Sequence, residues 1–247
     1  MIGRGIERKE IFRGAEDVED FLTRLGDVVK KCGLQVLAWS LLPNHFHLLV
    51  RTGATPLSTA MKKLLTGYVV NFNRRHKRHG YLFQNRYKSI VCDGERYLLE
   101  LVRYIHLNPY RAGLVKDMAG LARYEWSGHA ALMGRKEREW QETGEILGRF
   151  GDEEKSGRRG YEKYVKEGAE QGRRPELTGG GLVRSAGGWS EVIAMRRQKR
   201  PEAADHRVLG GGGFVEEVLR EAEKREHETL RFKRVKGGFE KICRKHP

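Results

Sequence analysis

The stretch from Leu41 to Arg51, LLPNHFHLLVR, decides the fold because it joins two β-suited segments across a turn. Pro43-Asn44 is typical of a turn, and the apolar run LQVLAWSLL at residues 34–42 precedes it. The residues after the turn alternate as a half-buried strand does, since successive side chains of a strand point to opposite faces. The two faces would carry His45, His47 and Leu49 on one side and Phe46, Leu48 and Val50 on the other. The stretch therefore predicts a β-hairpin with an apolar face against a core and two imidazoles together on the opposite face.

Two histidines at positions i and i+2 of a strand can each give one ring nitrogen to the same metal ion. His45 and His47 have this spacing. The alternative is that both rings simply lie on a hydrated sheet face. The pair alone leaves both interpretations open, and residues about sixty positions downstream bear on the choice.

Apolar residues at helical spacing flank the hairpin on both sides. They predict helices over residues 15–31, 56–79 and 95–108, with a further strand at about 87–92. The basic, glycine-punctuated residues 1–12 leave room for only a shortened first strand. This order predicts an α+β sandwich with helices on one face of a small antiparallel sheet.

Composition restricts the class of partner. The chain has 247 residues, and 48 Lys and Arg against 33 Asp and Glu give a net charge of +15, which calls for a polyanion such as nucleic acid. Three scattered cysteines form no C-x-x-C pair, and no apolar run approaches the ~18 residues of a membrane span, so we expect a cytoplasmic, nucleoid-associated protein. No G-x-x-x-x-G-K-[ST] motif is present, which argues against nucleotide hydrolysis or a nucleotide cofactor.

Basic residues gather in two places that suit contacts with DNA. The end of the helix predicted over residues 56–79 reads NRRHKRHG, and residues 81–93, YLFQNRYKSIVCD, interleave aromatic and basic side chains. Such a mixture suits single-stranded nucleic acid, because bases stack on rings and phosphates meet cations. The alternatives are a solvated helix end and aromatic core packing. With one more arginine beside the end of the third helix, the candidate DNA contacts are Arg74, Arg75, Lys77, Arg78, Arg86, Lys88 and Arg111.

The helix predicted over residues 95–108 carries the candidate nucleophile. Tyr104 and Asn108 are four residues apart and would share one helix face. Two imidazoles and the Asn108 amide oxygen suit a divalent cation, and such a cation can act as a Lewis acid on a phosphodiester. A phenol attacking that phosphate gives a covalent phosphotyrosine, which conserves the bond energy for rejoining.

Other interpretations of this helix stay open. The ring of Tyr104 could simply pack, Asn108 before Pro109 is also a common helix stop, and Tyr97 and Tyr110 are competing tyrosines. A metal-dependent hydrolase of small molecules could use the same two histidines, but it would leave the positive charge unexplained.

Three segments, PNHFHLLV, GYLFQNRYKSI and RYIHLNPYRAGLV, resemble the single-tyrosine HUH transposases of bacterial insertion sequences (IS200-like). The resemblance is greater to their REP-associated relatives, and it covers residues 3–134. It implies a ferredoxin-like (RRM-like) sheet and an endonuclease that nicks and joins single-stranded DNA at hairpins through a 5′-phosphotyrosine. It also implies Tyr104 as the nucleophile, His45, His47 and Asn108 as ligands of Mg²⁺ or Mn²⁺, and a monomer or homodimer that needs no ATP.

The expected domain organisation follows from a change in composition after Gly134. Residues 1–134 would form the catalytic domain, and residues 135–247 a helical, glycine-punctuated basic extension with a flexible join near 149–160. Helices are expected at 189–200 and 214–231, next to the glycine-rich stretches at 178–197 and 210–214. The second functional interpretation is a non-catalytic or decayed nucleic-acid-binding protein that keeps the basic sheet surface.

Overall fold

The computed structural model describes residues 1–170 and 207–225. Its described residues form two compact units, one of residues 1–89 and 97–170 and one of residues 90–96 and 207–225. Within these described ranges, no helix combines the length and the apolar character needed to cross a bilayer.

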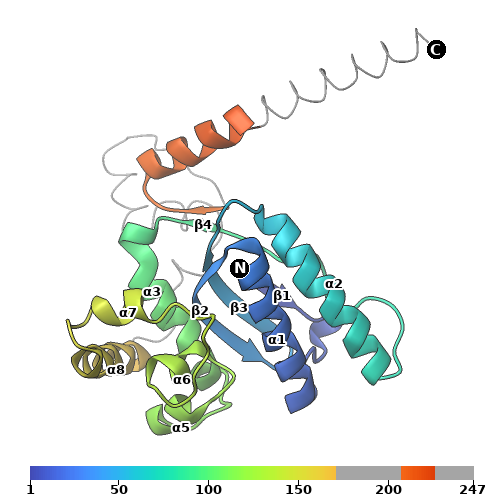
Figure 1. Cartoon of the computed structure of the whole chain (residues 1–247), viewed down its shortest axis with the longest axis horizontal. Coiled ribbons are helices and arrows are strands. Elements are labelled where there is room, and N and C mark those ends of the chain that lie inside the picture. The colour runs from blue at the N-terminus through green and yellow to red at the C-terminus, as the bar shows by residue number, and fades with distance from the viewer. Residues whose placement is uncertain (171–206, 226–247) are drawn as a thin grey trace. The chain divides into compact units, whose positions relative to one another are not determined.

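An antiparallel sheet of three strands forms the centre of the first unit (Figure 1). The strand order is β1 (Ile2–Arg4), β3 (His45–Arg51) and β2 (Gln35–Leu42). The predicted hairpin across Pro43-Asn44 is confirmed, because Leu42 pairs with His45 and the ladder continues from there to the far ends of both strands. The first strand is short, as expected, yet it is present and pairs with β3, with Arg4 opposite His45. The histidine strand is therefore paired along both of its edges, with β1 on one side and β2 on the other.

Residues 82–88 run along the outer edge of β1. The amide of Ile2 donates to the Lys88 oxygen and the Lys88 amide donates to the Ile2 oxygen, each at 2.9 Å. The Gln84 amide donates to the oxygen of Arg4, also at 2.9 Å. Across the sheet, this segment comes first and is followed by β1, β3 and β2. This spatial order is that of a ferredoxin-like sheet, which confirms the predicted fold class.

The strand predicted over residues 87–92 is wrong in its bounds. Pairing with β1 ends at Lys88, and β4 (Val91–Cys92) instead pairs in parallel with β5 (Val208–Leu209) inside the second unit. The chain thus passes from the first unit to the second after residue 89, within the segment predicted as one strand.

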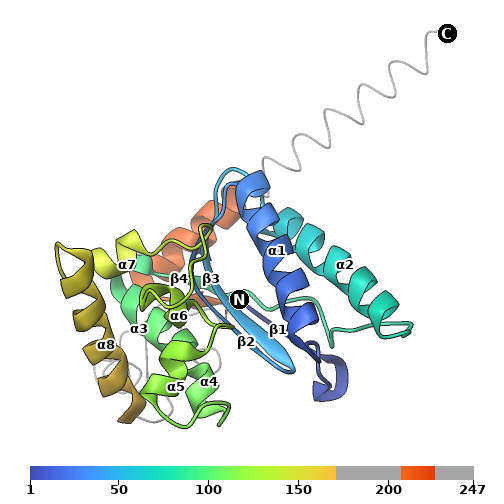
Figure 2. The ribbon, with the colours of Figure 1, turned by 60° about the horizontal axis from the view of Figure 1, so that its bottom comes forward.

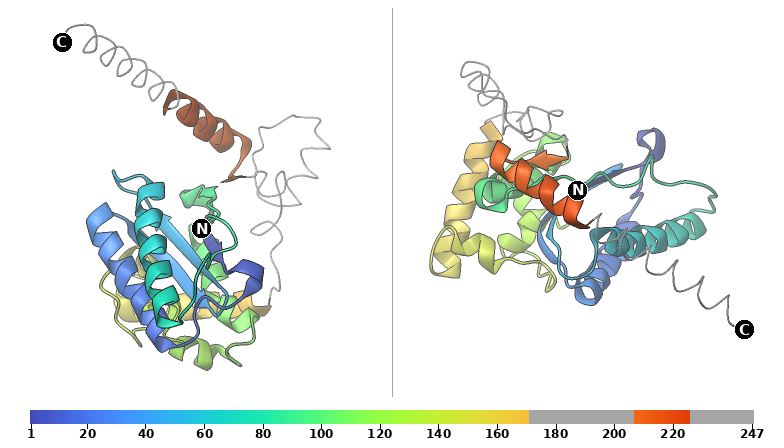
Figure 3. Two further views of the ribbon diagram at one scale, coloured as in Figure 1. Left: turned by 90° about the vertical axis from the view of Figure 1, so that its right-hand side faces the viewer. Right: turned by 90° about the horizontal axis from the view of Figure 1, so that it is seen from above.

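Two helices cover one face of the sheet, α1 (Ala15–Cys32) and α2 (Leu57–Arg75), and they lie side by side (Figure 3). α1 ends at Gly33, whose φ of 64° lies in the left-handed region that glycine adopts without strain. α2 ends four residues before the predicted residue 79. The core beneath these helices contains Phe46 and Leu48 of β3, both fully buried.

The opposite face of the sheet is covered too, although helices were expected on one face only (Figure 2). Residues Leu37 and Ala38 of β2 share a second core with helices that follow in the chain. These helices are α3 (Gly94–His106), α4 (Asn108–Arg111), α5 (Met118–Arg123), α6 (Gly128–Leu132), α7 (Gly144–Gly148) and α8 (Glu154–Glu170). The predicted third helix thus ends at His106, two residues early, and Asn108 begins α4.

The segment after Gly134 contributes to this second core. Residues of α7 and α8 are buried in it, among them Ile146, Tyr161 and Val165. The expected join near 149–160 is shorter, since α8 begins at Glu154. In the second unit, residues 212–225 are helical, so the helix begins two residues before the predicted 214–231 and its described part ends within that range. The helix expected at 189–200 and the glycine-rich stretch at 178–197 lie outside the described residues.

Candidate active site

His45 and His47 lie next to each other on β3. Their ring centroids are 5.1 Å apart and the rings are inclined by 72°. Phe46 and Leu48 are buried in the core on the other side of the strand, so the predicted division of faces is confirmed. The hairpin geometry alone places the two imidazoles where they can approach one ion.

A neighbouring amide sets the tautomer of His45. His45 Nδ1 lies 2.6 Å from Asn44 Oδ1, while the amide nitrogen of Asn44 donates to the oxygen of Arg8 at 3.1 Å. Because the amide oxygen faces the ring, Nδ1 of His45 carries the proton and Nε2 is the nitrogen able to bind a cation.

Both imidazoles are neutral at neutral pH. Burial, with a contribution from the Arg4 guanidinium, lowers the pKa of His45 to about 4. Burial, then the charges of His45, the Met1 ammonium and Arg4, hold the pKa of His47 well below its usual 6.5. Neutral imidazole is the form that binds metals, so both rings fit a metal-ligand role.

Tyr104, on α3, lies beside this pair. Its ring centroid is 6.1 Å from that of His47, and the two rings are nearly perpendicular, at 83°. The ring is partly exposed. Packing of α3 against the second face of the sheet thus brings together two motifs that are far apart in the sequence.

Asn108 lies at the bend between α3 and α4. Its side-chain nitrogen donates to the oxygen of Ile105 at 3.3 Å, which leaves the amide oxygen as the atom that could bind a cation. Its placement differs from the prediction, since Tyr104 and Asn108 belong to two short helices and not to one. The bend at Leu107 keeps helical dihedral angles, so the two helices are almost continuous.

The donor set fits a cation with open coordination positions. Within the described ranges, no group of three His, Cys, Asp or Glu side chains could hold a metal ion. An ion here would therefore use the two imidazoles, with the Asn108 oxygen and solvent or phosphate oxygens as further ligands. Such a mixed N and O set suits Mg²⁺ less than Mn²⁺, which accepts imidazole more readily.

The predicted DNA contacts fall into two groups. Arg74, Lys77, Arg86 and Lys88 are exposed, and the ring of Tyr81 between them is 83% exposed. These side chains are open to solvent at the end of α2 and along the edge beside β1.

The remaining three predicted DNA contacts have partners within the protein. Arg75 donates to a carboxylate oxygen of the buried Asp17 at 2.5 Å. Arg78 lies over the Phe72 ring, with its guanidinium carbon 5.7 Å from the ring centroid. Arg111 lies over the Tyr104 ring at 5.5 Å. Sequence reasoning missed this last neighbour because it ended the third helix at residue 108, whereas α4 continues the helical backbone to Arg111.

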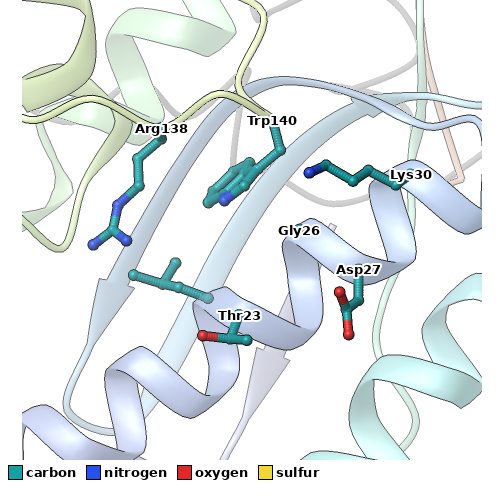
Figure 4. Close-up of a pocket in the computed structure, with 7 residues that line it drawn as sticks. Thr23, Gly26, Asp27, Lys30, Arg138 and Trp140 are labelled. Atoms are coloured by element: carbon teal, nitrogen blue, oxygen red, sulfur yellow. The ribbon is translucent and has the colours of Figure 1, made fainter.

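A pocket of about 210 Å³ lies between α1 and the segment that holds Arg138 and Trp140, and Figure 4 shows the side chains that line it. Thr23, Gly26, Asp27 and Lys30 line its α1 side. None of the predicted site residues contributes to it, and we assign it no role in the chemistry.

The comparison with protein families agrees with the resemblance in sequence. Residues 1–108 match the model of the family described as "Transposase IS200 like". No curated protein matches the chain. A solved structure with similarity to this chain is a REP-associated tyrosine transposase bound to a REP hairpin, with 15% sequence identity and a TM-score of 0.42. That match covers 57% of this chain and 87% of the other. The histidine strand and the tyrosine of α3 therefore both lie in the part of the chain, residues 1–108, that matches the IS200-like transposase family model.

Proposed function

We propose that this protein is a metal-dependent single-stranded DNA nickase and strand transferase that uses Tyr104 as its nucleophile. The observation that carries the proposal is that the rings of His45, His47 and Tyr104 lie next to one another. The ring centroids are 5.1 Å apart for His45 and His47 and 6.1 Å apart for His47 and Tyr104. Imidazole ligands, a phenol and a basic surface are the parts that such chemistry needs. The family match over residues 1–108 supports the same assignment.

In the proposed reaction, the Tyr104 oxygen attacks the scissile phosphorus and a Tyr–O–P bond forms. The phenolic proton passes to solvent or a nearby base, the bond to the 3′ oxygen breaks, and that oxygen leaves as a 3′-hydroxyl after taking up a proton. The 5′ side of the nick stays on the tyrosine. Reversal by another 3′-hydroxyl rejoins the strand without an external energy source.

His45 and His47, with the oxygen of Asn108, would hold Mn²⁺ or Mg²⁺. The bound ion supplies Lewis-acid stabilisation of charge on the phosphate oxygens and orients the phosphate. Because burial keeps both imidazoles neutral, no proton has to be displaced from them at neutral pH.

The DNA would lie across the exposed basic side chains. Arg86 and Lys88 follow the exposed Tyr81 in the same segment, so a single strand could stack a base on the ring while the cations meet its phosphates. Arg74 and Lys77, at the end of α2, extend the same chemistry to further phosphates. The net charge of +15 adds a long-range attraction.

The test is to incubate the full chain with Mn²⁺ and end-labelled hairpin oligonucleotides taken from inverted repeats that flank its coding region. We expect an SDS-resistant protein–DNA species that Tyr104→Phe eliminates. The matched control Tyr110→Phe, on the following helix α4, should retain it. EDTA or the change of either histidine to alanine should abolish the species while leaving DNA binding within about twofold. Absence of an adduct with every flanking hairpin would contradict the proposal.

The same experiment separates the second interpretation, a binding protein without catalysis. That protein would bind the hairpins with a steep salt dependence, would need no metal, and would be insensitive to loss of Tyr104. The exposed Arg74, Lys77, Arg86 and Lys88 are compatible with it.

A further inference from the structure

Helix α8 is tied to α3 by an arginine that the proposed chemistry does not use. The guanidinium carbon of Arg103 lies 4.1 Å from the centroid of the Tyr164 ring. Nη1 of Arg103 donates to the backbone carbonyl oxygen of Tyr164 at 3.4 Å. The next turn of α8 begins with a close approach, since a Cβ added at Gly168 would lie 2.3 Å from Arg103 Cδ. Glycine at this position lets the last turn of α8 lie directly on the Arg103 side chain.

The same turn of α8 contacts a second arginine, Arg111 of α4. Its Nη2 donates to the backbone oxygen of Gly168 in a long hydrogen bond of 3.4 Å, and its guanidinium carbon is 5.5 Å from the Tyr104 ring centroid. A cation within about 6 Å of an aromatic ring is attracted by the electrons of the ring. The planar, forked guanidinium can keep such a ring contact and a carbonyl contact at the same time.

We propose that Arg111, held by the C-terminal turn of α8, is a positioning residue that fixes the orientation of the Tyr104 ring. The catalytic consequence rests on the proposed function, because it requires Tyr104 to be the nucleophile. Attack in line with the leaving oxygen tolerates little displacement, and a misplacement of ~1 Å can cost about a hundredfold in rate. A segment well beyond the tyrosine helix in sequence thereby becomes part of the active site.

The competing role for Arg111 is a contact with a DNA phosphate. The two roles predict opposite results. A phosphate contact contributes to affinity and to its dependence on salt, with a slope that falls by about one when the cation is removed. A positioning residue contributes to the rate at saturating DNA and leaves affinity nearly unchanged.

The first experiment reads the ring directly and needs no activity. In the full chain with ¹³C-labelled tyrosine rings, the Tyr104 signal is assigned by its loss in Tyr104→Phe. We expect Arg111→Met to shift or broaden that signal while the signal of the exposed Tyr81 stays in place. The charge-matched control Arg159→Met, on the exposed side of α8, should leave Tyr104 unchanged. An unmoved Tyr104 signal in Arg111→Met would overturn the proposal.

The second experiment measures adduct formation in a single turnover at saturating hairpin DNA with Mn²⁺, together with equilibrium binding. We expect Arg111→Met to slow adduct formation by roughly tenfold or more, with the Kd and its salt slope unchanged. Arg111→Lys should recover part of the rate, since it restores a cation over the ring without the fork. Weaker binding with a shallower salt slope and an unchanged rate would assign Arg111 to a phosphate and contradict positioning.

A third variant tests whether α8 is the support. Gly168→Ala forces the last turn of α8 away from Arg103, so we expect the same shift of the Tyr104 signal and a smaller loss of rate. Gly148→Ala is the matched control, because a Cβ there meets nothing within 4 Å. A Gly168→Ala protein with the wild-type signal and rate would remove α8 from the proposal. If the wild-type protein forms no adduct at all, the proposed function fails, while the ring spectra still decide the role of Arg111.

Discussion

The hydroxyl of Tyr161 lies between two buried histidines, 2.7 Å from His106 Nδ1 and 2.9 Å from His129 Nδ1. A phenol has one proton to donate, so one imidazole accepts it and the other donates its own Nδ1 proton to the phenol oxygen. Nearby, the indole nitrogen of Trp39 donates to the Gln141 side chain at 2.7 Å. At the scale of single residues, the two hydrogen bonds of Tyr161 thus join α8 to α3 and to α6. Unlike an apolar contact, each of these bonds requires one particular partner atom.

Tyr161→Phe should destabilise the protein by about 1–3 kcal/mol, because it leaves buried imidazole nitrogens without a hydrogen bond. The measurement is the free energy of unfolding in urea. Tyr81→Phe removes the same hydroxyl from an exposed ring and should change the free energy by less than about 0.5 kcal/mol. Equal free energies of unfolding for the two variants would show that the Tyr161 hydroxyl does not contribute to stability.

The titration of His129 predicts an acid dependence of stability. Burial lowers its pKa to about 4 in the folded protein, against a usual 6.5. Between these values the unfolded chain binds more protons, so the contribution is fully present above pH 6.5 and is lost as the pH falls toward 4. From pH 7 to pH 5 the loss should be on the order of 2 kcal/mol.

The check compares urea unfolding of the wild-type protein and His129→Gln at several pH values. The variant should lose less stability than the wild-type protein over this interval, since it lacks the titrating group. Parallel curves for the two proteins would contradict the assignment of this acid sensitivity to His129.

At the scale of elements, a buried carboxylate joins the two helices on the first face of the sheet. Asp17, 1% exposed and near the start of α1, accepts from Arg75 and His76 at the end of α2, at 2.5 and 2.9 Å. It also accepts from the backbone amide of Arg13 at 2.9 Å. Part of the basic run NRRHKRHG therefore holds α2 against α1, and only its other members are open to a phosphate.

Asp17→Asn should lower the free energy of unfolding by about 2 kcal/mol, since it leaves a cation and an imidazole at a neutral amide in a buried place. The value is below that of a fully buried pair because the Arg75 side chain remains 26% exposed. Thermal or urea unfolding measures the change. Asp27→Asn is the control on the same helix. Its exposed pair with Lys31, at 3.8 Å, should contribute less than about 0.5 kcal/mol.

The short strand β1 depends on a close approach at Gly3. A Cβ at this position would lie 2.4 Å from Cε1 of Phe46, whose ring is fully buried in the first core. β1 in turn covers the histidine strand, and the Leu48 amide donates to the Met1 oxygen at 3.0 Å.

Gly3→Ala should therefore loosen β1 from β3, at a cost of about 1–3 kcal/mol for overpacking. Hydrogen exchange at the Leu48 amide is the direct measurement and should become faster, while the amides of α8 keep their protection. Unchanged exchange at Leu48 would mean that the Phe46 ring adjusts without moving the strand.

At the scale of the whole molecule, one sheet carries a core on each face, and the second core includes side chains from beyond residue 134. Leu37 of β2 and Val102 of α3 share it with Ile146, Tyr161 and Val165. We infer that the folding unit extends through α8, and that residues 135–170 are part of the domain that holds the site.

A chain of residues 1–170 should accordingly unfold cooperatively, whereas a chain of residues 1–134 should show a shallow transition or precipitate, because it exposes the apolar surface of the second core. Near-ultraviolet circular dichroism and urea unfolding compare the two. Cooperative unfolding of residues 1–134 with native-like stability would place the boundary at residue 134.

Local patterns in the sequence were sufficient for several features. The hairpin at Pro43-Asn44, the face shared by His45 and His47, and the end of α1 at Gly33 follow from turn chemistry and side-chain periodicity, and these act over a few residues. The same rules identified Tyr104 as a candidate, since helix spacing and the quoted motifs are visible in the chain itself.

Only the tertiary structure decided which distant segments meet. The pairing of β1 with the histidine strand, the approach of Tyr104 to His47, and the hold of α8 on Arg111 depend on contacts between residues far apart in sequence. Such contacts form when both cores pack around one sheet, and their geometry is set by the sum of many side-chain volumes. The residue types at the site are therefore a property of the sequence, and the distances between them are a property of the fold.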